Sequence, residues 1–288
     1  MAEQQENGAE GASGAEGGAD REPPHPGMVW IPGGTYTMGS ERHYPEERPV
    51  GPVAVDGFWM DETAVTNRQF AEFVAATGYV TTAEKAPDPA MYPGADPKML
   101  VPGSITFAKP PGPVDLANPM AWWAWTPGAS WRHPWGPRSG LEGREDHPVV
   151  QVTYEDADAY ARWAGKRLPT EAQWERAGRG GIEGAEFAWG DEIAPGGEER
   201  MNRWIGEFPW KFRPRPGGPR KPDTVAVRSF PPNPFGLYEI TGNAWEWTST
   251  WFSDGHPEPA SRCCAPVNPR GGEVDASRDP ASGIPRKV

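Results

Sequence analysis

Glycine and proline limit what this chain can fold into more than any other feature of its sequence. The 288 residues include 36 Gly and 36 Pro, a quarter of the chain, against about 12 % in average proteins. Proline breaks helices and sheets and glycine weakens both, so long regular elements are excluded. The 15 Trp can each bury roughly 150–250 Å². We expect a loop-rich α+β fold, with short strands and a few short helices packed on aromatic side chains.

Charge and hydropathy exclude several classes of protein. The formal net charge of -12 opposes binding to nucleic acid or to an anionic membrane surface. No run approaches the roughly 20 apolar residues of a membrane helix, so we expect no membrane span. Cys263 and Cys264 are adjacent, where a mutual disulfide is strained, and neither a disulfide framework nor an export signal is visible. We therefore predict a cytoplasmic location.

The first 27 residues differ in composition from the rest of the chain. They hold six carboxylates and six glycines, but no Val, Ile, Leu or aromatic residue. Such a segment cannot bury enough apolar surface to offset its chain entropy. We predict a disordered acidic tail over 1–27 and one domain over 28–288.

Strand signals are short and scattered. Segments 28–31 and 36–38 flank a Pro-Gly-Gly turn, which predicts a hairpin. Residues 53–60 alternate between apolar and polar and predict a strand, and 224–227 predict another. The stretch 87–137 is rich in Pro, Gly and Trp, and we expect it to be irregular.

Three helices are predicted by threonine caps that precede apolar residues at helical spacing. Thr66 opens a helix that ends before Gly78, and Thr153 opens one that ends before Gly165. Thr170 opens a third, with a glutamine at the capping-box position.

The most unusual segment runs from Gly236 to Trp247 around a Gly-Asn turn. Glu239 and Glu246 bracket this turn, seven residues apart. Calcium takes six to eight oxygen ligands at about 2.3–2.6 Å, so two carboxylates and the carbonyls between them suit it. The alternative is two surface glutamates beside core tryptophans, and the spacing alone leaves both open.

Other candidate sites are weaker. Cys263 and Cys264 are compatible with a redox or soft-metal site, but adjacent cysteines without a histidine more often form an ordinary loop. His43 and His147 have acidic neighbours but no metal-binding spacing. No glycine-rich phosphate loop opens a helix.

Two motifs are specific to one superfamily. Leu-Pro-Thr-Glu-Ala-Gln-Trp-Glu occupies 168–175, and Gly-Asn-Ala-Trp-Glu-Trp occupies 242–247. With them, the chain from Met28 to Val288 resembles the formylglycine-generating enzymes, also called sulfatase-modifying factors. The other stretches that carry the resemblance are 28–39, 61–70, 78–84, 122–135, 147–153, 163–167, 202–209 and 236–241.

The resemblance implies a variant of the C-type-lectin-like fold and an oxidase activity. Members of the family convert the cysteine of a Cys-x-Pro-x-Arg segment, in an unfolded sulfatase, to Cα-formylglycine with O₂. Two family cysteines in a C-terminal segment bind Cu(I) and the substrate thiol, as suits a soft monovalent ion.

The chain departs from the family at its C-terminus. It ends at Val288, where the family segment with the two copper-binding cysteines should begin, and Cys263 and Cys264 lie upstream in a Pro-rich insertion. We expect a fragment of a longer protein, whose domain is incomplete and which has no formylglycine-generating activity by itself.

The resemblance also implies calcium. The family's loop calcium is held at positions that match the Glu239 side chain, the Gly242 and Ala244 carbonyls and the Glu246 carboxylate. The residue after Ala244, Trp245, matches a tryptophan beside the family's active site.

A second family calcium is less certain in this sequence. It uses positions that match the Asn202 side chain and the Arg203 carbonyl, and then an acidic residue. Here the stretch from Trp210 to Lys221 is basic and has no carboxylate before Asp223. We expect this site to be absent or to use Asp223.

Two other functions compete with the oxidase. A lectin-like fold can present loops for binding without chemistry, so a non-catalytic binding module or an inactive homologue is the main alternative. An iron-dependent enzyme that forms C–S bonds would need a histidine-rich site in an N-terminal bundle, where this chain has an acidic tail.

For the oxidase, we expect tryptophans in 122–135 to pack on the substrate peptide and carboxylates elsewhere to hold its arginine.

Overall fold

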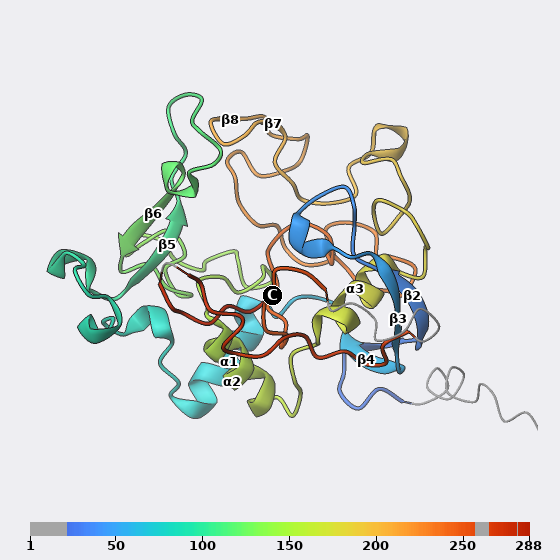
Figure 1. The fold of residues 1–288 in the computed structure, drawn as a ribbon. Coiled ribbons are helices and arrows are strands. Elements are labelled where there is room, and N and C mark those ends of the chain that lie inside the picture. Colours follow the sequence, from blue (N-terminus) through green and yellow to red (C-terminus); the bar gives the residue numbers. More distant parts are fainter. Residues whose placement is uncertain (1–21, 257–264, 281) are drawn as a thin grey trace, which may run out of the picture.

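The computed structural model describes residues 22–256, 265–280 and 282–288. Short elements are joined by long loops, as Figure 1 shows. The helices are α1 (Asn67–Thr77), α2 (Tyr154–Trp163) and α3 (Glu171–Arg179). The strands are β1 (Met28–Ile31), β2 (Gly34–Met38), β3 (Gly51–Val55), β4 (Phe58–Asp61), β5 (Gly103–Phe107), β6 (Trp123–Pro127), β7 (Gly206–Glu207) and β8 (Lys211–Phe212). Single 3-10 turns cover Pro45–Glu47, Thr82–Glu84, Pro89–Met91, Pro97–Met99, Pro119–Ala121 and Pro195–Gly197. The expected α+β class with little regular structure is confirmed.

The hairpin predicted at the start of the domain is wrong. Strand β1 pairs with β4 and β2 with β3, all antiparallel. The two pairs continue the same register: Ile31 lies opposite Phe58, and three residues later Gly34 lies opposite Val55, three residues earlier in the partner chain. The first two strands are therefore halves of one interrupted strand, and the predicted strand 53–60 is the second half of β3 followed by β4.

Close backbone approach explains the interruption. A Cβ on Gly33 would lie 2.6 Å from the Gly57 nitrogen, and a Cβ on Gly57 would overlap the Trp30 ring. Only glycine fits where the two chains cross this tightly. The Pro-Gly-Gly sequence marks a break in the ribbon, whereas the same residues in isolation indicate a turn.

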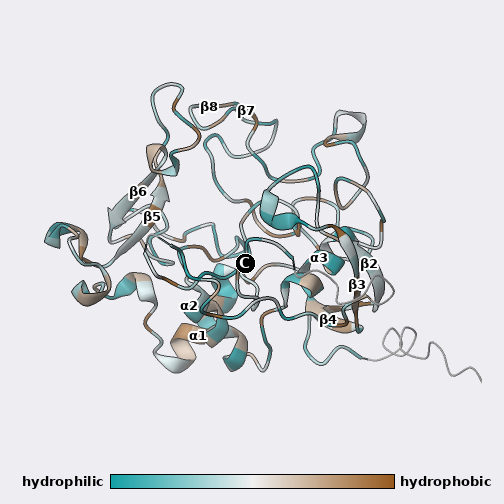
Figure 2. Cartoon of the chain, viewed as in Figure 1, coloured by the Kyte–Doolittle hydropathy of each residue, from teal (hydrophilic) through white to brown (hydrophobic). Residues whose placement is uncertain are grey.

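The three helices form where the caps predicted them. The Thr66, Thr153 and Thr170 hydroxyls each accept a hydrogen bond from the third residue of their helix, in a capping box. Helix α1 ends at Gly78, whose φ of 68° is left-handed. Figure 2 shows that apolar residues occur in short stretches, parts of α1 among them.

Two clusters of buried side chains join these elements. One is aromatic and lies between α1 and α2: Phe70, Phe73, Val74, Trp131 and Tyr160. The other joins β1, α3 and a later loop: Ile31, Ala177, Leu237 and Ile240. A third, smaller cluster places α3 against the ribbon, where the Tyr36 hydroxyl donates to the Ala172 carbonyl at 2.8 Å.

The stretch expected to be irregular contains a paired element. Strands β5 and β6 form an antiparallel ribbon that lies on the opposite side of the molecule from β2–β4 (Figure 1). Residues 224–227, predicted as a strand, form no strand, because Asn243 binds the backbone of Val225 through its side chain. Within the described ranges, no helix is long and apolar enough to cross a membrane.

The ordered chain begins before Met28. Residues 22–27, which we assigned to the acidic tail, are described, and the Gly27 carbonyl accepts a hydrogen bond from the Glu62 amide at 2.9 Å. Pro24 and His25 line the large cavity described below. Residues 1–21 of the predicted tail lie outside the described residues.

Candidate functional site

A cavity of about 420 Å³ lies between the two larger clusters of buried side chains. Its walls come from β4 with the segment after it, from α2, from the turn that precedes α3, and from the loop before Trp247. Phe70 and Tyr160 of the aromatic cluster face it together with Leu237 and Ile240 of the other. Apolar walls with a few polar groups are typical of binding sites.

The carboxyl group of Glu246 is the most unusual polar group at this cavity. It accepts a hydrogen bond from the Trp174 indole at 2.9 Å, one turn into α3. Burial raises the pKa of this carboxyl to about 7, and the Trp174 hydrogen bond opposes the shift. No cationic side chain contributes to the shift. The carboxyl therefore lacks a compensating positive charge.

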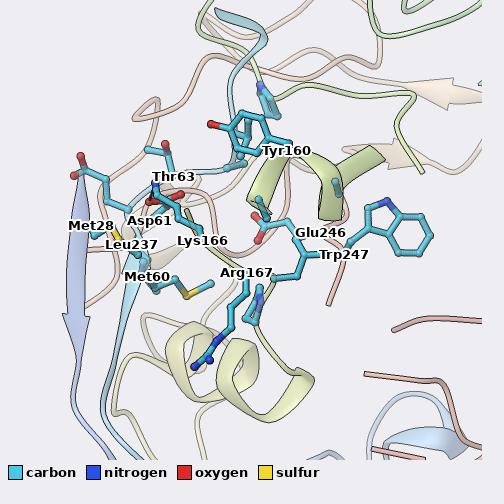
Figure 3. A pocket seen from close by; sticks show the side chains of 18 of the residues that line it. Met28, Met60, Asp61, Thr63, Tyr160, Lys166, Arg167, Leu237, Glu246 and Trp247 are labelled. Atoms are coloured by element: carbon cyan, nitrogen blue, oxygen red, sulfur yellow. Dashed lines mark hydrogen bonds and ion pairs between the residues drawn. The ribbon is translucent and has the colours of Figure 1, made fainter. Parts of the chain in front are cut away.

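Other charged groups at the cavity are paired or exposed. Lys166 donates to the Asp61 carboxylate at 2.7 Å, which ties the turn before α3 to the end of β4 (Figure 3). Arg167 also faces the cavity and makes no hydrogen bond or ion pair within the described ranges. Figure 3 shows Arg167, Tyr160 and Glu246 around the same space.

Two tryptophans flank Glu246 at the cavity. Trp245 is 97 % exposed and Trp247 is 38 % exposed. The Trp247 indole donates to the Val152 carbonyl at 3.2 Å, which fixes the end of the loop. Trp245, predicted to lie beside the active site, thus offers nearly its whole ring to a ligand.

Glu239 is turned away from solvent. Its two carboxylate oxygens accept the backbone N–H groups of Arg228 at 2.7 Å and Phe230 at 2.9 Å. The residue is buried and has a left-handed φ of 48°. The reading of Glu239 as a surface glutamate is therefore wrong, because its side chain organises the neighbouring backbone.

Asn243 fixes the middle of the same loop. Its side-chain oxygen accepts the Val225 N–H at 2.9 Å and the Asn202 amide at 3.1 Å, and its amide donates to the Val225 carbonyl at 3.2 Å. A left-handed φ of 63° suits asparagine. The Gly242 carbonyl accepts the Ala244 N–H at 2.8 Å.

The donors predicted for the loop calcium suit that ion in chemistry, since all are carboxylate or carbonyl oxygens. Glu239, Gly242 and Glu246 also accept hydrogen bonds inside the protein. The uncompensated Glu246 carboxyl is the feature that favours a cation here. The Ala244 carbonyl is the fourth ligand predicted for the loop calcium. Calcium binding stays a prediction.

The donors predicted for the second calcium are engaged differently. The Asn202 amide donates to the Asp223 carbonyl at 2.8 Å, while the Asp223 carboxylate accepts two N–H groups of Arg144, one at 2.8 Å. The Asp223 carboxylate is thus bound to an arginine.

The described part of the chain holds no cysteine that could bind copper. Cys263 and Cys264 lie outside the described residues. Within 22–256, 265–280 and 282–288, no group of three or more His, Cys, Asp or Glu side chains is arranged to hold a metal ion. The described residues therefore supply no thiolate for Cu(I), and copper binding stays a prediction.

The tryptophans of 122–135 mostly serve packing. Trp131 is 1 % exposed and packs edge-on against Phe70, and Trp122 is 8 % exposed. Trp135 is 37 % exposed, with Lys221 over its ring. A peptide-binding role for the buried members is therefore excluded.

Sequence reasoning missed the partners that hold the site. Lys166 with Asp61 and Trp174 with Glu246 join residues 105 and 72 positions apart. No local pattern reveals such pairs. Asn243 had a usable signal, because asparagine after glycine is frequent at left-handed turn positions.

The chain is similar to proteins of one family. Residues 15–279 match the family model described as a sulfatase-modifying factor enzyme 1-like domain. The formylglycine-generating enzyme of Mycobacterium tuberculosis is 52 % identical over 242 residues, which are 83 % of this chain and 80 % of that protein. The enzyme of the same name from Bos taurus is 41 % identical over 282 residues, 93 % of this chain and 71 % of that protein.

Two further matches concern activity and fold. A mouse protein named inactive C-alpha-formylglycine-generating enzyme 2 is 37 % identical over 237 residues, 79 % of this chain and 70 % of that protein. The structure of PvdO from Pseudomonas aeruginosa matches with a TM-score of 0.50 at 19 % identity, over 91 % of this chain and 87 % of that one. The latter match concerns the fold alone.

Proposed function

The chain belongs to the sulfatase-modifying factor enzyme family, and we propose that it is a formylglycine-generating enzyme that acts on sulfatase polypeptides. The observation that carries this proposal is the 52 % identity to the M. tuberculosis enzyme of that name, over 83 % of this chain. The Trp245–Trp247 segment, which belongs to the superfamily motif, supports it by lying at the large cavity.

The proposed reaction oxidises the cysteine of a Cys-x-Pro-x-Arg segment with O₂. The Cβ–S bond breaks, the sulfur leaves as H₂S, and Cβ gains one oxygen atom as an aldehyde. The other oxygen atom becomes water, with two electrons and two protons from a thiol reductant. We assign no step to copper, because the described residues hold no thiol to bind it.

The cavity and its rim supply a place for the substrate. An extended peptide can pack its proline or arginine against the exposed ring of Trp245, since an arginine stacks well on an aromatic face. The acidic protein attracts a basic peptide at long range. The cytoplasmic location stays a prediction.

We also propose that Ca²⁺ binds the 239–246 loop, through Glu239, Gly242, Ala244 and Glu246. The support is the chemistry of these oxygens and the missing positive charge beside Glu246. The role is structural: the ion would fix the loop that presents Trp245.

An inactive homologue or a binding module remains the second candidate. The observation that favours it is the match to a mouse protein named as inactive. In this case the cavity would bind a sulfatase peptide without changing it.

Mass spectrometry of a Cys-x-Pro-x-Arg peptide separates the two candidates. The peptide is incubated with O₂, a thiol reductant and copper, together with the 288-residue chain and with any longer product of the intact gene. The enzyme proposal requires the aldehyde product from the protein of the intact gene. We expect none from the 288 residues alone, because Cys263 and Cys264 do not match the family's copper-binding pair. Peptide binding without any aldehyde from either protein would support the second candidate.

A further inference from the structure

Residues 211–221 form a strongly basic segment, which we call the basic strip. Its sequence is Lys-Phe-Arg-Pro-Arg-Pro-Gly-Gly-Pro-Arg-Lys. Five cations stand in eleven residues without one carboxylate, in a chain whose formal net charge is -12. This local reversal of charge has no role in the proposed reaction.

The basic strip is attached to the domain at both ends. At its start, β8 pairs with β7, and the Phe212 ring packs against the Trp204 ring at 5.2 Å. Near its middle, the Arg215 guanidinium lies 4.6 Å from the centre of the Phe230 ring. At its end, the Lys221 ammonium lies 5.5 Å from the centre of the Trp135 ring. Three prolines further restrict the chain, so the cations are displayed on a constrained backbone.

Two of the cations have no partner. The side chains of Arg213 and Arg220 are exposed and make no ion pair, hydrogen bond or ring contact within the part of the chain that the structure describes. The nearby carboxylates are already engaged. Glu207 pairs with Lys211 at 2.7 Å, and the Asp223 carboxylate, with its side chain 9 % exposed, is bound by Arg144.

We propose that the basic strip binds an acidic segment of another polypeptide in an extended conformation. Arginine pairs with carboxylates in a bidentate manner, and unpaired arginines on a restrained backbone lose little entropy when they do so. Trp135, 37 % exposed beside Lys221, provides an apolar contact at one end. Single-stranded nucleic acid is the competing polyanion, and the experiment below includes it as an outcome. The proposal does not depend on the proposed oxidase function.

Fluorescence anisotropy with a labelled ten-residue glutamate peptide tests the proposal. The full chain should bind the peptide in about 20 mM salt and lose most of that affinity in about 200 mM salt. The R213E/R220E variant should bind about tenfold more weakly in low salt. The matched control is K98E/R270E, which changes two exposed cations elsewhere on the described surface whose side chains make no ion pair or hydrogen bond there.

Both variants shift the formal net charge from -12 to -16, so the long-range repulsion is the same. Equal melting temperatures of the two variants and the parent protein show that the fold is kept. Retained binding in K98E/R270E with loss in R213E/R220E supports the basic strip as the site. Equal loss in both variants, no binding to the parent protein, or tighter binding of a ten-nucleotide single-stranded DNA would overturn the proposal.

Discussion

The 239–246 loop and the basic strip occupy the two places where the family resemblance implies calcium, and they differ in charge and in packing. The loop keeps two carboxylates, both turned inward, and the strip carries five cations, four of them exposed. Asn202 lies between them and contacts both the loop residue Asn243 and the backbone of Asp223.

The difference shows that two neighbouring segments of one domain can favour ligands of opposite charge. In the loop, carboxylates without cationic partners are held by backbone and indole N–H groups. Beside the strip, Arg144 neutralises the remaining carboxylate of Asp223. A cation is favoured at the loop, whereas an anion is favoured at the strip.

Removing the carboxylate of Glu239 should have the largest effect on stability. Glu239→Ala leaves two backbone N–H groups without acceptors, one of them in the buried residue Phe230. We expect a loss of about 3 kcal/mol in the free energy of unfolding, measured by urea denaturation. The control, Glu273→Ala, removes an exposed carboxylate and should change stability by less than about 0.5 kcal/mol. Equal effects would show that Glu239 does not hold the loop.

Calcium should stabilise the loop and leave the strip unaffected. At about a hundred times its Kd, Ca²⁺ should raise the free energy of unfolding by about 2.7 kcal/mol, and EDTA should reverse this. Glu246→Gln should weaken the response, whereas Glu273→Gln should keep it. Isothermal titration calorimetry should give one site per chain. Two calcium sites per chain, or the same melting temperature with calcium and with EDTA, would contradict the view that the loop binds calcium and the strip does not.

Without calcium, Glu246 should make stability depend on pH. Its pKa in the folded state is about 7, above its ordinary value of 4.5. Between these values the unfolded carboxyl is ionised while the folded one keeps its proton, so the free energy of unfolding falls as pH rises and then levels off above about 7. We expect a loss of about 3 kcal/mol across this range, measured by thermal unfolding in EDTA. The Glu246→Gln variant should lose this slope; the same slope in the variant would assign it to other groups.

Among the loop residues, Asn243 should have the smallest effect on the free energy of unfolding. Asn243→Ala removes the side-chain contacts to Val225 and Asn202 and places alanine at a left-handed φ. We expect a loss of about 1.5 kcal/mol in urea denaturation. Arg213→Ala in the strip, which breaks no contact within the described ranges, should change stability by less than about 0.5 kcal/mol. A larger loss for Arg213→Ala would mean that the strip supports the fold.

Local signals in the sequence were sufficient for the helices. Thr66, Thr153 and Thr170 begin α1, α2 and α3 because a cap is satisfied within four residues of the chain. The loop-rich character also follows from the sequence, since proline and glycine act on the backbone wherever they stand. The superfamily motif placed Glu246 and Trp245 together at one site.

Pairing and side-chain direction needed the tertiary structure. Whether Pro32 and Gly33 form a turn or a break depends on Gly57, which lies opposite in a ribbon that local patterns do not specify. The ribbon of β5 and β6 was missed because its strands are 15 residues apart in a stretch rich in proline.

The sequence by itself determined the helix caps, the loop-rich class and the motif that carries Trp245 and Glu246. The tertiary structure alone decided that Glu239 binds the backbone of Arg228 and Phe230, that Glu246 lacks a cation, and that the Arg213 side chain has no partner within the described residues. The physical reason is range. A cap or a turn is satisfied by neighbours in the chain, whereas the burial and the partners of a charge are set by segments that meet only in the folded protein.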